Sequence, residues 1–146
     1  MTNQVKKKLV MTEKAAEAEF FKWGEISDRD FSMKDLDDDD IASFKQMKRR
    51  IVEQMSKGHL KLTEEGYIKY KPHTSPGLSA ELEFVFKPFT GQDYAAMDTV
   101  KKDKTQTKMH AMVAASLGVH INDINKLSGA DYNVVMKAIV PLFLDE

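Results

Sequence analysis

The acidic run at residues 35–40 is the first stretch of this sequence whose side chains could do chemistry. Five aspartates and one leucine follow one another there, and clustered carboxylates are ligands that calcium prefers. An EF-hand loop, however, alternates its oxygen ligands and needs a glycine at its sixth position and a glutamate at its twelfth. No start within the run supplies that glycine. We therefore interpret the run as solvated acids at a helix start, where the helix dipole favours negative charge.

Other reactive groups are scattered along the chain. The absence of cysteine excludes disulfides, thiolate nucleophiles and cysteine-bound zinc. No histidine has a second histidine three or four residues away, and the serines considered as nucleophiles lack a G-x-S-x-G setting. These residues are His59, His73, His110 and His120, and Ser75, Ser116 and Ser128. Because the seven glycines are also single, no phosphate loop is present, and we expect no catalytic site, no cofactor and no metal.

Charge and hydropathy limit the partners. The 22 basic and 23 acidic residues nearly cancel, and the basic runs around Lys6, Lys48 and Lys101 are short. A nucleic-acid-binding protein usually shows a basic excess, so we expect no nucleic acid, although a small regulatory protein stays an open alternative. No stretch approaches the roughly 20 apolar residues of a membrane span. The apolar run at residues 9–11 is too short for a signal peptide, which favours an intracellular, non-membrane protein.

The elements that must position any site begin with a charged helical extension at residues 1–58. A first helix is predicted at residues 12–23, with Thr12 as its N-cap and Gly24 as its end. After a polar loop or short helix, a second helix is predicted at residues 41–57, with Asp40 as its cap. Its apolar residues recur every three or four positions and are Ile41, Phe44, Met47, Ile51 and Met55.

After Gly58 the pattern changes to that of strands. Residues 60–62 and 67–70 flank a turn with Gly66 at the position that needs positive φ, which predicts a β-hairpin. A third strand is predicted at residues 82–86, after a loop at residues 72–79 that is rich in proline and serine. The sequence thus predicts an α+β fold with one antiparallel sheet of about three strands.

The remainder of the predicted domain at residues 59–146 is helical. Thr90 and Asp93 form the capping-box pattern, which opens a helix to about residue 102. Helices are predicted next at residues 106–117, ended by Gly118, and at residues 121–126. Ser128 and Asp131 repeat the capping-box pattern and start the last helix, in which Pro141 predicts a kink or a loose final turn. Nine methionines, several at helical spacing, favour core packing or an adaptable binding surface, and both readings stay open.

Several short motifs of this domain occur together in a known family. They are E-F-V-F-K-P-F-T-G-Q-D at residues 83–93, A-A-S-L-G-V at residues 114–119, L-S-G-A-D-Y at residues 127–132 and F-L at residues 143–144. In this pattern and order, residues 59–146 resemble the tail assembly chaperones of contractile-tailed phages such as P2 and Mu. The residues 1–58 are not part of the usual pattern.

The resemblance implies a non-enzymatic function in the host cytoplasm. A chaperone of this family would bind the tail tape-measure protein and keep it soluble until tail-tube subunits polymerise around it. The tail tube protein as a second partner and a homo-oligomer both stay open. The main alternative is a minor structural tail or baseplate component that is retained in the virion.

For a chaperone the partner site should be apolar and should lie on the helical C-terminal part, because its partner is an aggregation-prone helical protein. The candidates lie at the edges of helix stripes or near a chain end, and they are Phe89, Tyr94, Met97, Ile139 and Phe143. The competing interpretation is that most of them belong to the core.

Overall fold

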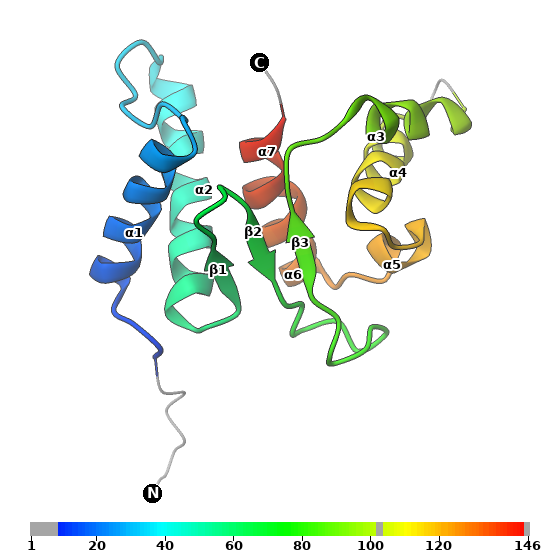
Figure 1. Cartoon of the computed structure of the whole chain (residues 1–146), viewed down its shortest axis with the longest axis horizontal. Helices are drawn as coiled ribbons and strands as arrows, with labels where there is room; N and C mark the ends of the chain where they lie inside the picture. The colour runs from blue at the N-terminus through cyan, green and yellow to red at the C-terminus, as the bar shows by residue number, and fades with distance from the viewer. Residues whose placement is uncertain (1–8, 102–103, 145–146) are drawn as a thin grey trace, which may run out of the picture. The chain divides into compact units, whose positions relative to one another are not determined.

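The computed structural model describes residues 9–101 and 104–144, and its contacts divide the chain into two compact units, Met1–Ile68 and Lys69–Glu146. The order of helices and strands is shown in Figure 1. The fold is α+β, with N-terminal helices, a three-stranded antiparallel sheet and a helical C-terminal part in chain order, as the sequence predicts. The basic run around Lys6 lies outside the described residues.

The first unit contains the helices α1 (Glu13–Ile26) and α2 (Asp38–Ser56). Thr12 caps α1 as predicted, because its side chain accepts a hydrogen bond from the amide of Ala15 at 3.1 Å. The predicted stop at Gly24 is wrong, since α1 continues to Ile26. Gly24 instead lies against the ring of Phe31, where a Cβ would come within 2.4 Å of the ring carbons. Glycine is needed there for close approach and not for helix termination.

The loop between α1 and α2 supplies part of the core of this unit. Phe31 stacks on Phe20 with ring centroids 4.7 Å apart, and Phe44 of α2 lies 5.3 Å from Phe31. Helix α2 carries the predicted apolar stripe, but its predicted cap at Asp40 is wrong. The side chain of Asp37 accepts from the amide of Asp40 at 2.8 Å, so α2 starts one turn earlier than predicted.

The strands are β1 (Leu60–Leu62), β2 (Ile68–Tyr70) and β3 (Phe84–Phe86), in the order β1-β2-β3. Gly66 has a φ of 86°, which confirms its predicted turn position. The third strand starts two residues later than predicted. The amide of Leu82 donates to the carbonyl of Ser79 at 3.1 Å, so residues 79–82 form a turn. The division between the two units falls inside β2.

The second unit continues with α3 (Gly91–Ala95), the 3₁₀ segment η1 (Ala96–Thr99), α4 (Thr105–Leu117) and α5 (Ile121–Asn125). The predicted helix to about residue 102 is wrong, because α3 tightens to η1 and Val100 is extended. The hydroxyl of Thr99 donates to the carbonyl of Ala96 at 2.8 Å inside this tighter turn. Gly118, in the left-handed conformation, ends α4 as predicted.

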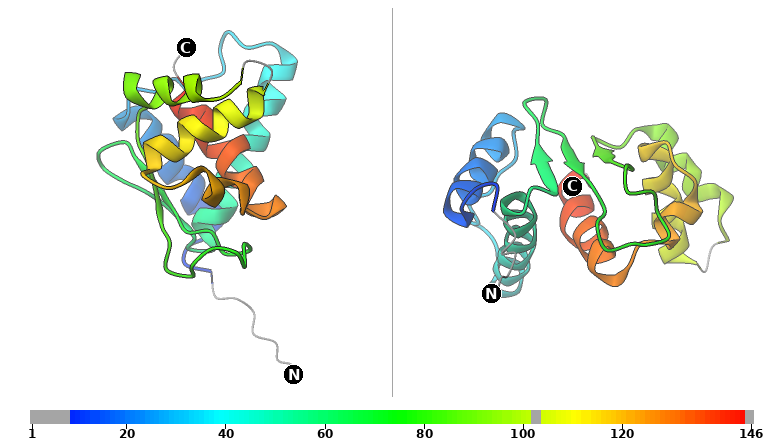
Figure 2. Two further views of the ribbon diagram at one scale, coloured as in Figure 1. Left: turned by 90° about the vertical axis from the view of Figure 1, so that its right-hand side faces the viewer. Right: turned by 90° about the horizontal axis from the view of Figure 1, so that it is seen from below.

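The last helix has three parts, α6 (Gly129–Val134), the π-helical segment η2 (Val135–Ile139) and α7 (Val140–Phe143), which follow one another without a break (Figure 2). The amide of Val140 donates to the carbonyl of Val135, the five-residue spacing of a π-turn. Pro141 cannot donate to a helical carbonyl, and its ring crowds the preceding turn. The distortion predicted from Pro141 therefore takes the form of a widened π-turn just before it.

Candidate functional site

The five residues predicted to bind a partner lie in two kinds of environment. Phe89, Ile139 and Phe143 are buried, with 9%, 0% and 3% of their surface exposed. Tyr94 in α3 is 36% exposed, and Met97 in η1 is half-buried. The structure brings Phe89 and Tyr94 together, with their rings edge to face and the centroids 6.1 Å apart. Of the five, a partner could reach Tyr94 and Met97 on the folded protein.

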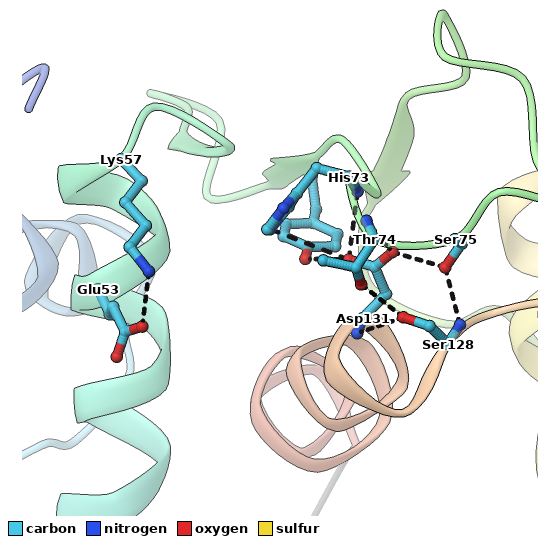
Figure 3. Close-up of polar contacts among 8 residues, drawn as sticks. Glu53, Lys57, His73, Thr74, Ser75, Ser128 and Asp131 are labelled. Atoms are coloured by element: carbon cyan, nitrogen blue, oxygen red, sulfur yellow. Dashed lines mark hydrogen bonds and ion pairs between the residues drawn. The ribbon is translucent and has the colours of Figure 1, made fainter. Parts of the chain in front are cut away.

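A buried carboxylate at the start of α6 accepts four hydrogen bonds from one segment of the second unit. The side chain of Asp131 has no exposed surface. It accepts hydrogen bonds from the hydroxyls of Tyr70 at 2.7 Å and Ser75 at 2.6 Å. It also accepts from the amides of His73 at 3.2 Å and Thr74 at 3.0 Å (Figure 3). Asp131 thereby binds the segment 70–75, which begins at the last residue of β2, to the start of α6.

Ser128 also belongs to this cluster, and its hydrogen bonds differ from those of the predicted capping box. Its hydroxyl accepts from the amide of Asp131 at 3.4 Å, so half of the box is present. The side chain of Asp131 does not return to the amide of Ser128, because it is turned toward the segment 70–75. The amide of Ser128 donates instead to the hydroxyl of Ser75 at 2.8 Å, and the hydroxyl of Ser128 is also hydrogen-bonded to that of Thr74 (Figure 3).

The electrostatics of the cluster keep the carboxylate charged. Burial alone would raise the pKa of Asp131, but the hydrogen bonds from Ser75, Tyr70 and the two backbone amides outweigh it and lower this pKa. The pKa of Tyr70 is raised by burial first and then by its hydrogen bond to Asp131 and the charge of that carboxylate. Tyr70 therefore stays protonated and donates.

The residue types Ser75, His73 and Asp131 are those of a hydrolytic triad, but their arrangement is different. In a triad the imidazole lies between the hydroxyl and the carboxylate. Here the hydroxyl of Ser75 donates directly to Asp131, and the nearest ring nitrogen of His73 is 4.0 Å from that carboxylate. Ser75 itself is buried. The cluster can orient the backbone of the segment 70–75, and its hydroxyl, imidazole and carboxylate do not follow the order of a triad.

His110 is a second polar centre of this unit. Its Nδ1 lies 3.0 Å from the side-chain oxygen of Asn125, and its Nε2 lies 2.9 Å from the hydroxyl of Tyr132. The ring thus joins α4, α5 and α6, with both nitrogens engaged. Within residues 9–101 and 104–144 no group of three or more histidine and acidic side chains is placed to hold a metal ion.

The first unit contains a hollow of about 270 Å³, lined by apolar and charged residues, between the last turns of α1 and the end of β1. Trp23 is 3% exposed, whereas Ile26 is 55% exposed and Leu62 is half-buried. Charged residues surround the apolar ones, and they are Glu19, Lys22 and Glu64. Arg29 follows the end of α1, and its guanidinium lies over the Trp23 ring, 4.4 Å from the ring centroid.

Sequence reasoning missed this hollow because it ended α1 at Gly24. If the helix is continued by one turn, Ile26 follows Trp23 by three residues and Lys22 by four, which places these side chains along one side of α1. The apolar Ile26 after a glycine was therefore the signal that could have extended the helix and revealed the hollow.

Comparison of the chain with models of protein families, with curated proteins and with solved structures found no match. Within the described part of the chain, none of the helices has the length and apolar character that a membrane span requires.

Proposed function

We propose that this chain is a phage tail assembly chaperone that binds the tail tape-measure protein and keeps it soluble in the host cytoplasm. The resemblance of residues 59–146 to that family supports the proposal. The structural observation that carries it is the hollow of the first unit, because the exposed Ile26 and the half-buried Leu62 there offer a surface for a partner's apolar side chains.

The size and rim of the hollow suit a helix more than a small molecule. Its volume of about 270 Å³ is slightly below the usual range of ligand pockets, about 300–1,000 Å³. An amphipathic helix could place one or two apolar side chains against Ile26 and Leu62 while its polar residues meet the rim charges. The rim carries both positive and negative charge, because Glu19 and Lys22 are three residues apart on α1. It can therefore bind a helix that also carries both kinds of charge.

One such contact is weak, which agrees with a chaperone that must later be displaced. Many copies along one elongated partner would sum their weak contacts into stable coverage. Tyr94 and Met97 of the second unit offer a further accessible apolar surface of the same kind. Polymerising tube subunits could then remove the copies one at a time.

The deciding experiment is co-expression of the tape-measure protein with and without this chain. We expect the tape-measure protein to be soluble with the chain and to aggregate without it. Equal solubility in both cases would end the chaperone proposal. Because a chaperone leaves the particle, mass spectrometry of purified tails should find the chain absent or scarce. A stoichiometric presence would favour the structural tail or baseplate component.

The hollow is tested by Ile26→Asp, with Leu36→Asp as its matched control. Both positions are exposed, at 55% and 42%, so both variants should fold. We expect Ile26→Asp to lose the solubilising effect and Leu36→Asp to retain it. Tyr94→Asp tests the predicted C-terminal site in the same way. If Tyr94→Asp alone abolishes the effect, the partner site lies in the second unit and not at the hollow.

A further inference from the structure

The exposed side of α2 carries four residues whose spacing gives a single straight stripe. Asp38, Ala42, Lys45 and Arg49 follow one another at intervals of four, three and four residues, and all four are exposed. A separation of eleven residues is just over three helical turns, so Asp38 and Arg49 lie on the same side of the helix, about 16 Å apart along its axis. The buried stripe of α2 lies on the other side, with Ile51 and Met55.

The charges of this stripe lack partners within the structure. Among the described residues, the side chains of Asp38, Lys45 and Arg49 take part in no hydrogen bond or ion pair. Their neighbour Lys48, by contrast, is paired with Glu17 of α1 at 3.1 Å. The stripe borders the contact between α1 and α2, because Lys45 and Arg49 line a hollow of about 300 Å³ together with Glu13 and Glu17 of α1.

The order of residues in the stripe is self-complementary. When two copies of α2 are laid antiparallel, with a two-fold axis between residues 43 and 44, Asp38 of each copy faces Arg49 of the other. In the same register Lys45 of each copy faces Ala42 of the other. A parallel pair would put Asp38 beside Asp38 and Arg49 beside Arg49, which costs repulsion. Only the antiparallel arrangement matches opposite charges, and it is the isologous contact of a two-fold dimer.

The shape of the surface agrees with the same register. A shallow hollow of about 440 Å³ is lined by Ala42, Lys45, Gln46 and Arg49. The small side chain of Ala42 leaves room there for a second helix at the usual interaxial distance of about 8–10 Å. The methylene stem of a facing Lys45 would lie in this hollow, with its ammonium group in water.

We propose that the occupant of this face is a second copy of the chain, bound through an antiparallel α2–α2 contact. The inference is independent of the proposed chaperone function. A contact of one 19-residue helix per copy buries less than the roughly 1,200–2,000 Å² of a standard interface. The dimer is therefore weak, depends on concentration and loses affinity as salt screens its charges.

Sedimentation equilibrium of the full chain tests this directly, at protein concentrations up to about 1 mM. We expect a monomer–dimer equilibrium at about 50 mM salt that shifts toward monomer at about 500 mM. Asp38→Arg alone and Arg49→Asp alone should each raise the dimer Kd by about tenfold or more, because both contacts become like-charged. Asp39→Arg, one position away from the stripe in the same first turn, is the matched control and should dimerise like the wild type.

Mixing the two single variants gives the sharpest result. A heterodimer of Asp38→Arg with Arg49→Asp restores an Arg–Asp pair at both contacts, so the equimolar mixture should dimerise although each variant alone does not. A folding defect could not be rescued by mixing. The proposal is overturned if the wild type stays monomeric over the whole range, if the single variants dimerise like the wild type, or if the mixture stays monomeric.

The absence of cysteine from the chain allows a second, covalent test. In the antiparallel register, Asp38→Cys together with Arg49→Cys places the two introduced thiols of different copies face to face. Mild oxidation should then yield disulfide-linked dimers. Asp38→Cys alone should not cross-link, because the two copies of that residue are about 16 Å apart, well beyond disulfide reach. Equal cross-linking of both variants would contradict the register.

Discussion

The starts of α3 and α6 share one sequence pattern and use it differently. At α3, the amide of Asp93 donates to the hydroxyl of Thr90 at 3.3 Å, and the amide of Thr90 donates to the carboxylate of Asp93 at 2.9 Å. This is a closed capping box within four residues. At α6, Ser128 plays the part of Thr90, but the carboxylate of Asp131 leaves the box and binds the segment 70–75 instead.

The difference shows how a local signal can be redirected by tertiary contacts. A capping box satisfies two amides of its own helix and contributes about 0.5–2 kcal/mol. A fully buried carboxylate with four donors is more costly to disturb, because its removal leaves those donors unsatisfied. The same residue type therefore has a small effect at one helix start and a large effect at the other.

The largest contrast is expected between Asp131→Ala and Asp93→Ala. Asp131→Ala removes the acceptor of four hydrogen bonds and should lower the free energy of unfolding by about 3–5 kcal/mol. Asp93→Ala opens only the local box and should cost about 1 kcal/mol. Urea denaturation measures both, with the slope as a check that the unfolding mechanism is unchanged. Similar losses in the two variants would contradict the comparison.

The contribution of a single donor is measured by Tyr70→Phe. The change removes the hydroxyl 2.7 Å from Asp131 and leaves the ring in the core, so we expect a loss of about 1–2 kcal/mol. Tyr67→Phe is the control, because the hydrogen bond described between Tyr67 and the Thr63 side chain uses the backbone amide of Tyr67. A change at Tyr70 no larger than at Tyr67 would mean that the hydroxyl adds nothing to the cluster.

The two caps themselves are compared by Ser128→Ala and Thr90→Ala. We expect each to lower the free energy of unfolding by about 0.5–2 kcal/mol, since each removes an acceptor for a helix amide. Ser128→Ala should lie at the upper end, because its hydroxyl also bonds that of Thr74. An unchanged denaturation midpoint and slope for Ser128→Ala would show that this cap has no energetic role.

The contribution of the Asp131 charge should depend on pH. The pKa of Asp131 is lowered in the folded protein, so its stabilisation is fully present above the unfolded value of about 3.9. That stabilisation is lost as the pH falls through the lower folded pKa. The stability difference between the wild type and Asp131→Asn should therefore shrink below about pH 4. A difference that stays constant to about pH 2 would show that the charge of Asp131 does not contribute.

Local features of the fold could be predicted from the sequence, and contacts over long sequence distances could not. Thr12, Gly66 and Gly118 act where the pattern predicts, because caps and positive φ depend on nearby residues. The role of Asp131 depends on Tyr70, which is 61 positions earlier, and no periodicity reports such a pair. A carboxylate three residues after a serine or threonine is compatible both with a local capping box, as at α3, and with a long-range cluster, as at α6.

For the same reason, some of the predicted partner residues lie in the core and others at the surface. An apolar residue at the edge of a helix stripe can face the core or the solvent, and the choice depends on which segment packs against it. Phe89 and Tyr94 are five positions apart, yet the first is buried and the second is the more exposed member of the pair. The exposed Ile26 was missed because a glycine, which usually ends a helix, serves close packing with Phe31 here.

The separation of Tyr70 and Asp131 also bears on the order of events in folding. Their hydrogen bond closes a loop of 61 residues, and contacts of such long sequence separation form slowly because chain entropy is lost before they stabilise anything. Helices α4 and α5 lie inside that loop and can form from neighbouring residues alone. The cluster around Asp131 is thus expected to be made after the folding transition state, so that it slows unfolding and leaves the folding rate almost unchanged.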